Sequence, residues 1–264
     1  MALIGIGLLT GVTTVLFGFG GGFVAVPVVV WADAALGADA MRVATATSAL
    51  VMVVNAGFAT AVTPRRVLLA LRGSGTLLLL LAAGGSAGAL ATRLAPPDPA
   101  RWAFVAYVAL TLADLLLRPG FLRPRPPDEA PSGAPRPLPA VLGVPVGAVA
   151  AFLGVGGSVM TVPAMRRAGH TMHTATALAN PLTLAIALPA TVVSLGGTVV
   201  PAAVDAHVHL AGLVDLRAAS ALLLGALPVI AVLRRRPPRI PDRTHAWAYI
   251  GLLAVVTVAM LFAA

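Results

Sequence analysis

Long apolar runs without any Asp, Glu, Lys or Arg constrain this chain more than any other feature. Five such runs cover residues 2–32, 43–62, 73–92, 138–165 and 174–204. Each run meets the requirement of about 20 residues for a helix that spans a bilayer. Weaker apolar segments at 102–117, 211–233 and 245–264 follow the same pattern. The sequence therefore predicts an integral membrane protein with eight hydrophobic segments.

The continuity of these runs predicts helices. Backbone groups find no water in a bilayer core, so only helices and closed barrels cross it, and the runs lack the period-two alternation of barrel strands. A mean hydropathy of +0.96 agrees with a membrane protein. The predicted fold class is all-α and polytopic. The first run has no basic segment before it and no cleavage site after it, so it is expected to stay in the mature protein.

Several function classes are not predicted. The chain has no cysteine, which removes disulfides, thiolate metal sites and cysteine nucleophiles. It has no HExxH, GxSxG or GK[ST] motif, so neither an enzyme nor an ATP-driven pump is predicted. No metal and no cofactor are expected. The net charge of +9 comes from arginines in short loops between apolar runs, which is the positive-inside pattern of membrane proteins and not a nucleic-acid surface.

A glycine cluster followed by a proline occurs twice. The stretch GFGGGFVAVP begins at Gly18 and GVGGSVMTVP begins at Gly154, and residues 11–27 align with 147–163 without gaps. A polar triplet follows each cluster, Thr-Ala-Thr at 45–47 and again at 174–176. The chain is therefore predicted to be duplicated, with a first membrane repeat over 1–117, a Pro/Arg-rich linker over 118–137 and a second repeat over 138–264.

The placement of arginines distinguishes two topologies. Four basic loops follow the second, fourth, fifth and seventh apolar segments. If the first and fifth segments enter the membrane and return as hairpins, all four loops fall on one side, which the positive-inside rule assigns to the cytoplasm. Each half then has a hairpin plus three crossings, and the two halves are inverted repeats. The alternative is a tilted helix broken at the glycines, with eight crossings and parallel repeats; the hairpin arrangement is favoured.

The glycines can end one half-helix and begin another inside the membrane. A half-helix N-terminus presents free N–H groups and a partial positive charge, which suit an anion. Neutral hydroxyls and amides near two such ends would hold an oxyanion without a charged side chain. The alternative for a single glycine is close helix packing, as expected for Gly84, Gly85 and Gly88. The candidate substrate-binding residues are Gly18, Gly20, Gly21, Gly22, Thr45, Thr47, Ser48, Asn55, Gly154, Gly156, Gly157, Ser158, Thr174, Thr176 and Asn180.

Two ionisable residues are candidates for coupling transport to an ion. Asp114 lies one turn before Arg118, and an interfacial i, i+4 ion pair is favoured there over a proton carrier. His173 directly precedes the second polar triplet, so its protonation would bias substrate binding. The HxxH at 170–173 and the HxH at 207–209 lack a third ligand, so they do not predict a metal site. H⁺ and Na⁺ both stay open as the coupling ion.

The two motif pairs, GFGGGFVAVP with RVATATSAL and GVGGSVMTVPAM with HTATALANP, resemble the TauE/SafE family of sulfite exporters and sulfonate permeases. The resemblance covers both halves of the chain. It implies a multi-spanning permease in the bacterial plasma (inner) membrane with a small anionic substrate, and it carries the glycine and triplet residues over as site candidates. The second copy departs from the pattern at Ser158 and Ala177, where the first has a glycine and Ser48.

The expected function is secondary transport of a small anion, most specifically sulfite or an organosulfonate, by alternating access to a site near the membrane midplane. The alternative is a passive anion channel, and an accessory membrane subunit is least favoured. The expected partners are the anion, the lipid bilayer and a coupling H⁺ or Na⁺. The sequence leaves open the direction of transport and whether the chain forms a homo-oligomer.

Overall fold

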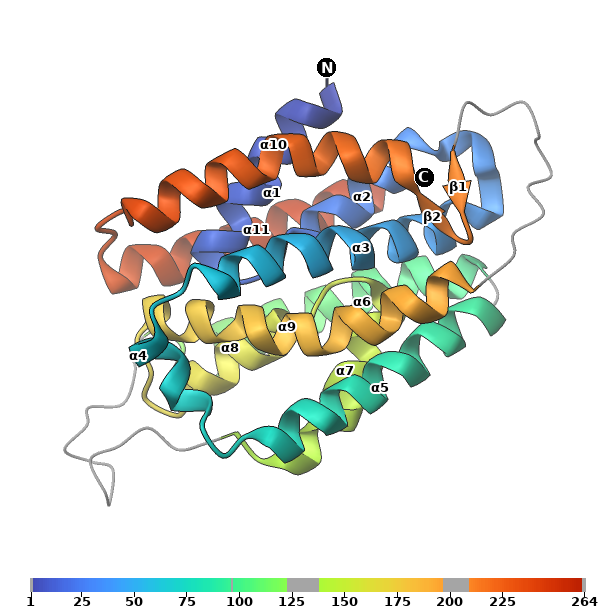
Figure 1. The fold of residues 1–264 in the computed structure, drawn as a ribbon. Coiled ribbons are helices and arrows are strands. Elements are labelled where there is room, and N and C mark those ends of the chain that lie inside the picture. The colour runs from blue at the N-terminus through green and yellow to red at the C-terminus, as the bar shows by residue number, and fades with distance from the viewer. Residues whose placement is uncertain (1, 96, 123–137, 197–208, 263–264) are drawn as a thin grey trace.

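Six long helices form the body of the molecule. A computed structural model describes residues 2–95, 97–122, 138–196 and 209–262 (Figure 1). Within this part of the chain, the helices long and apolar enough to cross a membrane are α3 (Ala40–Ala61), α5 (Gly75–Leu94), α6 (Pro97–Leu117), α9 (Met172–Leu195), α10 (Leu216–Arg235) and α11 (Asp242–Phe262). The protein is thus an all-α polytopic membrane protein.

The first and fifth apolar segments are each split into two shorter helices. The first segment forms α1 (Ala2–Phe17) and α2 (Gly22–Ala32), and the fifth forms α7 (Gly143–Leu153) and α8 (Ser158–Arg167). The glycine clusters lie at the two splits. We call residues 18–21 the first break and residues 154–157 the second break.

The chain reverses its direction at the first break. Before the break, α1 runs alongside α10 in the same direction, because Gly7 lies against Leu222 and Val15 packs beside Ile230. After the break, α2 runs back, and Asp33 at its end lies close enough to Asp215, at the start of α10, for their charges to interact. The two short helices therefore form a hairpin.

The second break reverses the chain in the same way. Here α7 runs alongside α5, with Gly143 against Leu81 and the Phe152 carbonyl accepting a hydrogen bond from Thr92 near the end of α5. Helix α8 then returns to the end of the bundle from which α7 started. Each hairpin thus places its first arm on a long helix of the other half, α1 on α10 and α7 on α5, while α3 and α9 pack together between them (Figure 1).

Small residues make these arms fit. A Cβ atom added to Gly11 would lie 2.6 Å from the carbonyl oxygen of Ala226. Gly84 and Gly88 lie still closer to the backbone of α7, and Gly85 lies against the backbone of α9 at Ile186. The prediction that these three glycines serve close helix packing is confirmed.

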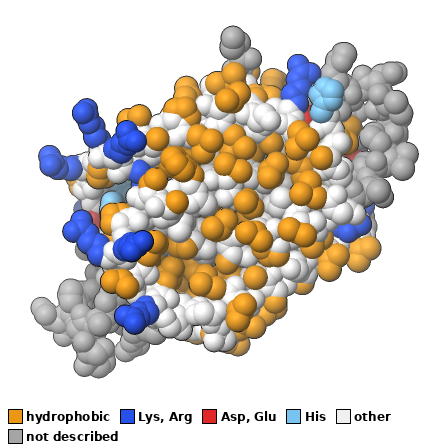
Figure 2. Space-filling view, viewed as in Figure 1, with side chains coloured by type: hydrophobic (Ala, Val, Ile, Leu, Met, Phe, Trp, Pro, Cys, Tyr) orange, Lys and Arg blue, Asp and Glu red, His pale blue; other side chains and the backbone are white. Residues whose placement is uncertain are grey.

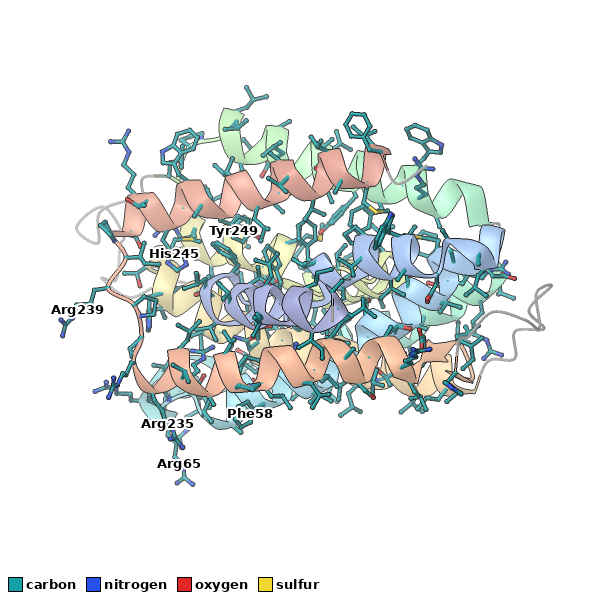
Figure 3. The ribbon with its side chains drawn as sticks, turned by 90° about the horizontal axis from the view of Figure 1, so that it is seen from above. Phe58, Arg65, Arg235, Arg239, His245 and Tyr249 are labelled. Carbon is teal, nitrogen blue, oxygen red and sulfur yellow. The ribbon has the colours of Figure 1, made fainter. Side chains whose placement is uncertain are left out.

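Charged side chains gather at the two ends of the bundle. Arg65, Arg235 and Arg239 lie at one end, which also holds Arg166 (Figure 3). We call this the Arg166 end and the opposite one, where α2 ends and α10 begins, the Asp33 end. An apolar belt covers the face between the ends (Figure 2), as a bilayer core requires. Exposed apolar side chains on the long helices include Leu79, Leu110, Leu188, Leu224 and Val255.

Short elements connect the long helices. Among the described residues they are the 3₁₀ helices η1 (Ala34–Asp39), η2 (Leu69–Leu71) and η4 (Ala140–Leu142), the one-turn helix α4 (Arg65–Leu68) and the antiparallel strands β1 (Leu210–Ala211) and β2 (Val214–Asp215). The sequence did not predict the strand pair. Most of the expected linker, residues 123–137, and also His207 lie outside the described residues, so the boundaries of the two repeats stay a prediction.

Candidate functional site

The first break is built from glycines in a backbone conformation that other residues rarely adopt. Gly18, Gly20 and Gly21 have φ values of +73°, +62° and +83°, in the left-handed region where glycine pays no steric penalty. Gly18 donates its N–H to the Thr14 carbonyl and closes α1. Gly21 then stands directly before α2, so the first break ends one helix and begins another within four residues.

The second break has the same course with fewer left-handed residues. Gly154 and Gly156 have φ values of +69° and +72°, and Gly154 caps the end of α7. Gly157 has an ordinary helical φ of −72° before Ser158, the first residue of α8. The predicted helix interruption therefore occurs at both clusters, with a different backbone at the last glycine.

The two breaks meet in the middle of the bundle. A Cβ atom on Gly156 would lie 3.3 Å from the Phe19 carbonyl oxygen of the first break. Met52 of α3 and Thr183 of α9 fill the space around both breaks, because each lies within 3.2 Å of the Cβ positions of Gly20 and Gly156. Neither residue was among the candidates predicted from the sequence. Thr183 carried a signal, since it follows the candidate Asn180 by one helical turn on the same face.

Hydrogen bonds cross between the halves at this centre. Ser48 of α3 donates to the Gly154 carbonyl at 3.0 Å. Thr183 of α9 donates to the Gly18 carbonyl at 3.5 Å. Asn180, also on α9, donates to the Thr14 carbonyl of the first half at 3.5 Å and, within its own helix, to the Thr176 carbonyl at 3.2 Å. Each central helix therefore donates hydrogen bonds to the C-terminal end of the first hairpin helix of the other half. Helix α3 donates to the end of α7, and α9 donates to the end of α1.

Several buried polar atoms at the breaks have no hydrogen-bond partner. Asn55 of α3 is fully buried, and neither atom of its amide is paired. Its Nδ2 lies 2.8 Å from the Cβ position of Gly21, at the start of α2. The Oγ of Ser158, at the start of α8, is also buried and unpaired. An unpaired buried polar group costs about 1–3 kcal/mol, and beside helix N-termini such donors could pair with an anion.

The polar triplets divide between this centre and the ends of the bundle. Thr45 lies against Gly154, and the Thr176 carbonyl lies 2.5 Å from the Cβ position of Gly18. Thr47 instead accepts a hydrogen bond from the Asp215 N–H towards the Asp33 end. Thr174 bonds with Thr171 in the cap of α9 at the Arg166 end. The structure thus brings Thr45 and Thr176 to the breaks and leaves Thr47 and Thr174 away from them.

The two coupling candidates lie at the Arg166 end and not at the breaks. Asp114 pairs with Arg118 at 3.2 Å, which confirms the predicted i, i+4 ion pair, and also with Arg167 at 2.6 Å. These three residues line a cavity of about 520 Å³ between α5, α6, α7 and α8. His173 is exposed and lies beside the loop that follows Arg236.

Sequence reasoning treated Arg166 only as a loop arginine, yet its side chain is fully buried. Its guanidinium pairs with Asp242 of α11 at 2.7 Å and donates to the carbonyls of Phe121 and His170. Nearby, the Tyr249 hydroxyl of α11 donates to the Ser158 carbonyl at 3.1 Å, and both Tyr249 and His245 are placed in Figure 3. Helix α11 therefore holds α8 at both ends, which the sequence pattern did not indicate.

A comparison with protein families agrees with the motifs at the breaks. Residues 3–260 match the family model described as sulfite exporter TauE/SafE. The chain belongs to the TauE/SafE family. No curated protein and no solved structure matches it. Since the match covers nearly the whole chain, this TauE/SafE protein is a membrane transporter of a family that handles sulfite-type anions, and it is not an enzyme. The described residues contain no cluster of metal-ligating side chains.

Proposed function

We propose that this TauE/SafE protein is a secondary transporter of sulfite or a small organosulfonate, and that the anion binds where the two breaks meet. The observation that carries the proposal is the fully buried, unpaired amide of Asn55 beside the first turn of α2. The N-terminal turns of α2 and α8 would supply N–H groups and partial positive charge. The hydroxyls of Ser48 and Ser158 would complete a neutral set of donors.

Neutral donors suit transport because the substrate must leave again. A full positive charge buried with an anion would hold it tightly in a low-dielectric interior. Hydrogen bonds from amides, hydroxyls and backbone N–H groups are weaker and let the anion exchange with water once the site opens. Two other site candidates, Thr47 and Thr174, would then not contact the bound anion. They would act in the movement of the helices or along the path of the anion through the protein.

We propose further that the halves are inverted repeats which alternate access to this site. The reciprocal packing of α1 on α10 and of α7 on α5 supports the proposal, because each half uses equivalent elements to hold the other. With the positive-inside rule, the Arg166 end faces the cytoplasm of a bacterial cell and the Asp33 end faces the outside. The cavity between α5, α6, α7 and α8, with Arg118 and Arg167 at its wall, would admit the anion from the cytoplasm.

Counterflow in liposomes tests the proposal. The purified full-length chain is reconstituted, and uptake of labelled sulfite is measured against internal unlabelled sulfite or methanesulfonate. Saturable exchange, with accumulation under an imposed ion gradient, supports a carrier. Flux that follows the sulfite gradient and never concentrates sulfite would support the channel. No exchange of either anion by the folded protein contradicts the proposed function.

The Asn55→Ala variant tests the site itself. A hydrogen bond to a charged partner contributes about 1.5–3 kcal/mol, so the apparent affinity for sulfite should fall about tenfold or more. The variant should not lose the stability of a broken hydrogen bond, because the amide bonds no protein group. The matched control is Ser86→Ala, which removes a hydroxyl that bonds only its own helix at Ala82. An unchanged affinity in Asn55→Ala would place the anion elsewhere.

A further inference from the structure

Two buried carboxyl groups lie together at the Asp33 end, away from both breaks. Asp33 follows the last residue of α2 and is 5% exposed, while Asp215 precedes the first residue of α10 and is 4% exposed. Their charges interact. Neither residue was among the coupling candidates predicted from the sequence, which were Asp114 and His173.

Asp215 is held in surroundings that suit a negative charge. Its Oδ1 accepts hydrogen bonds from the N–H groups of Arg217 at 2.8 Å and Ala218 at 3.2 Å. These are orphan donors in the first turn of α10, and a helix N-terminus favours an anion. Its own N–H donates to Thr47 at 2.9 Å, which fixes the residue against α3.

Asp33 has the opposite surroundings. It lies at the C-terminal end of α2, where the helix dipole disfavours a negative charge, and its Oδ2 is buried without a hydrogen-bond partner. Burial, and after it the charge of Asp215, raise the pKa of Asp33 to about 6. Of these two buried carboxyl groups, Asp33 is therefore the one placed to bind and release a proton near neutral pH.

Two arginines on neighbouring helices at this end are engaged with other groups. Arg42 of α3 is engaged with Asp39 at 3.0 Å and with the Ala95 carbonyl. Arg101 of α6 donates to carbonyls at the end of α11. Arg217, at the start of α10, is not a free charge either, because it also has an interaction partner. The charge that acts on the pKa of Asp33, after burial, is that of Asp215.

We propose that Asp33, with Asp215 as its fixed neighbour, is the proton-binding site that couples anion movement to a pH gradient. The inference rests on the proposed function, because α2 links the two sites: its first turn lies at the first break and its last turn at Asp33. Asp33 takes one proton from the water at the Asp33 end. When it releases that proton, both carboxylates are charged, and their repulsion moves the end of α2 away from α10. Helix α2 carries its first turn with it.

Transport under a pH gradient tests the coupling. In the reconstituted wild-type protein, an imposed pH gradient should drive sulfite accumulation. In Asp33→Asn, which mimics the protonated state, sulfite exchange should no longer respond to pH, and gradient-driven accumulation should fall at least about fivefold. Asp39→Asn is the matched control, since Asp39 lies at the same end and pairs with Arg42. A wild-type pH response in Asp33→Asn, or accumulation driven by Na⁺ alone, overturns the proposal.

A second variant removes the neighbouring charge and keeps the helix cap. Asparagine caps helices as well as aspartate does, so Asp215→Asn should fold. Without the like charge, the pKa of Asp33 should fall, and the midpoint of the pH dependence of sulfite transport should move to lower pH. An unchanged midpoint would show that Asp215 does not act on the proton site.

Protein stability tests the proton site without transport. Asp33 has an ordinary pKa of 3.8 when unfolded and about 6 when folded, so the folded state binds the proton more tightly. Its contribution to stability is greatest below about pH 4 and is lost as pH rises through about 6. The melting temperature of wild type relative to Asp33→Asn should therefore fall over this range, and a constant difference contradicts the site. If wild type fails to exchange sulfite yet shows this fall, the proposed function fails and the proton site stands.

Discussion

The two breaks share a sequence pattern but differ at their last residue and at the residue that follows it. Gly21, the last residue of the first break, is left-handed at φ +83°, and the next residue, Gly22, lies in contact with Met52. Gly157, the last residue of the second break, has a φ of −72°, and Ser158 follows it in the place of Gly22. The first break is constrained by its backbone and by a methionine from α3, whereas the second leaves room for a side chain. Equivalent positions in a duplicated chain are therefore under unequal steric constraint.

This difference bears on the proposed anion site. The first break offers an amide from Asn55 and the second offers a hydroxyl from Ser158, both buried and unpaired. The donor that faces the start of each short helix thus comes from α3 in one case and from the helix itself in the other. Symmetric motifs therefore produce an asymmetric set of donors.

The largest expected effect is at a position where the two breaks agree. Gly18→Ala places a Cβ atom 2.5 Å from the Thr176 carbonyl oxygen in a left-handed residue. The conformation alone costs about 1–2 kcal/mol, and backbone atoms cannot move aside, so we expect more than about 2 kcal/mol of destabilisation and loss of sulfite exchange. Melting in detergent measures it. Gly5→Ala, with nothing within 4 Å, is the control, and equal stability of the two variants contradicts the break geometry.

An intermediate loss of stability should distinguish the first break from the second. Gly21→Ala combines a left-handed φ with Asn55 Nδ2 at 2.8 Å, whereas Gly157→Ala has an ordinary φ and meets only the flexible tip of Ile186 at 2.6 Å. We expect Gly21→Ala to be less stable than Gly157→Ala by about 1–2 kcal/mol. Denaturation of both variants under one condition gives this difference. Equal losses would mean that the second break is as constrained as the first.

The smallest expected loss of stability comes from exchanging the residue types at Gly22 and Ser158. In Gly22→Ser the new side chain must displace Met52, which also lies against Gly20 and Gly156. We expect a cost of about 1 kcal/mol, the low end of overpacking, because methionine adapts its shape. The reverse change, Ser158→Gly, removes an unpaired hydroxyl and should cost less. Thermal melting compares the pair, and a greater loss in Ser158→Gly would show that its Oγ has a structural partner.

The fold was predictable wherever its cause is local. Continuous apolar runs predicted the long helices, including the weaker ones that became α6, α10 and α11. The glycines predicted the interruptions because only glycine adopts the left-handed region without strain. The duplication indicated that two interruptions would be equivalent in the chain. Which residues around them are buried without a partner was not predictable, because that depends on the neighbours.

The structure places some candidate residues at the breaks and others far from them. The amides of Asn55 and Asn180 and the hydroxyl of Ser48 lie where the sequence placed them, at the glycines. Asp114 and His173 were chosen as ionisable residues near the membrane, but they lie at the Arg166 end. Asp33, which has the shifted pKa, was passed over because a loop aspartate carries no sequence sign of its burial.

By itself, the sequence determined that this protein is a helical membrane protein with a repeated glycine break, since hydropathy and glycine freedom act within a few residues of the chain. Only the tertiary structure decided that the hairpins pack on the opposite halves, that Met52 and Thr183 enclose both breaks, and that Arg166, Asp33 and Asp215 are buried. The physical reason is that burial and pairing are set by contacts between residues far apart in the chain, such as Asp33 with Asp215 or Ser48 with Gly154.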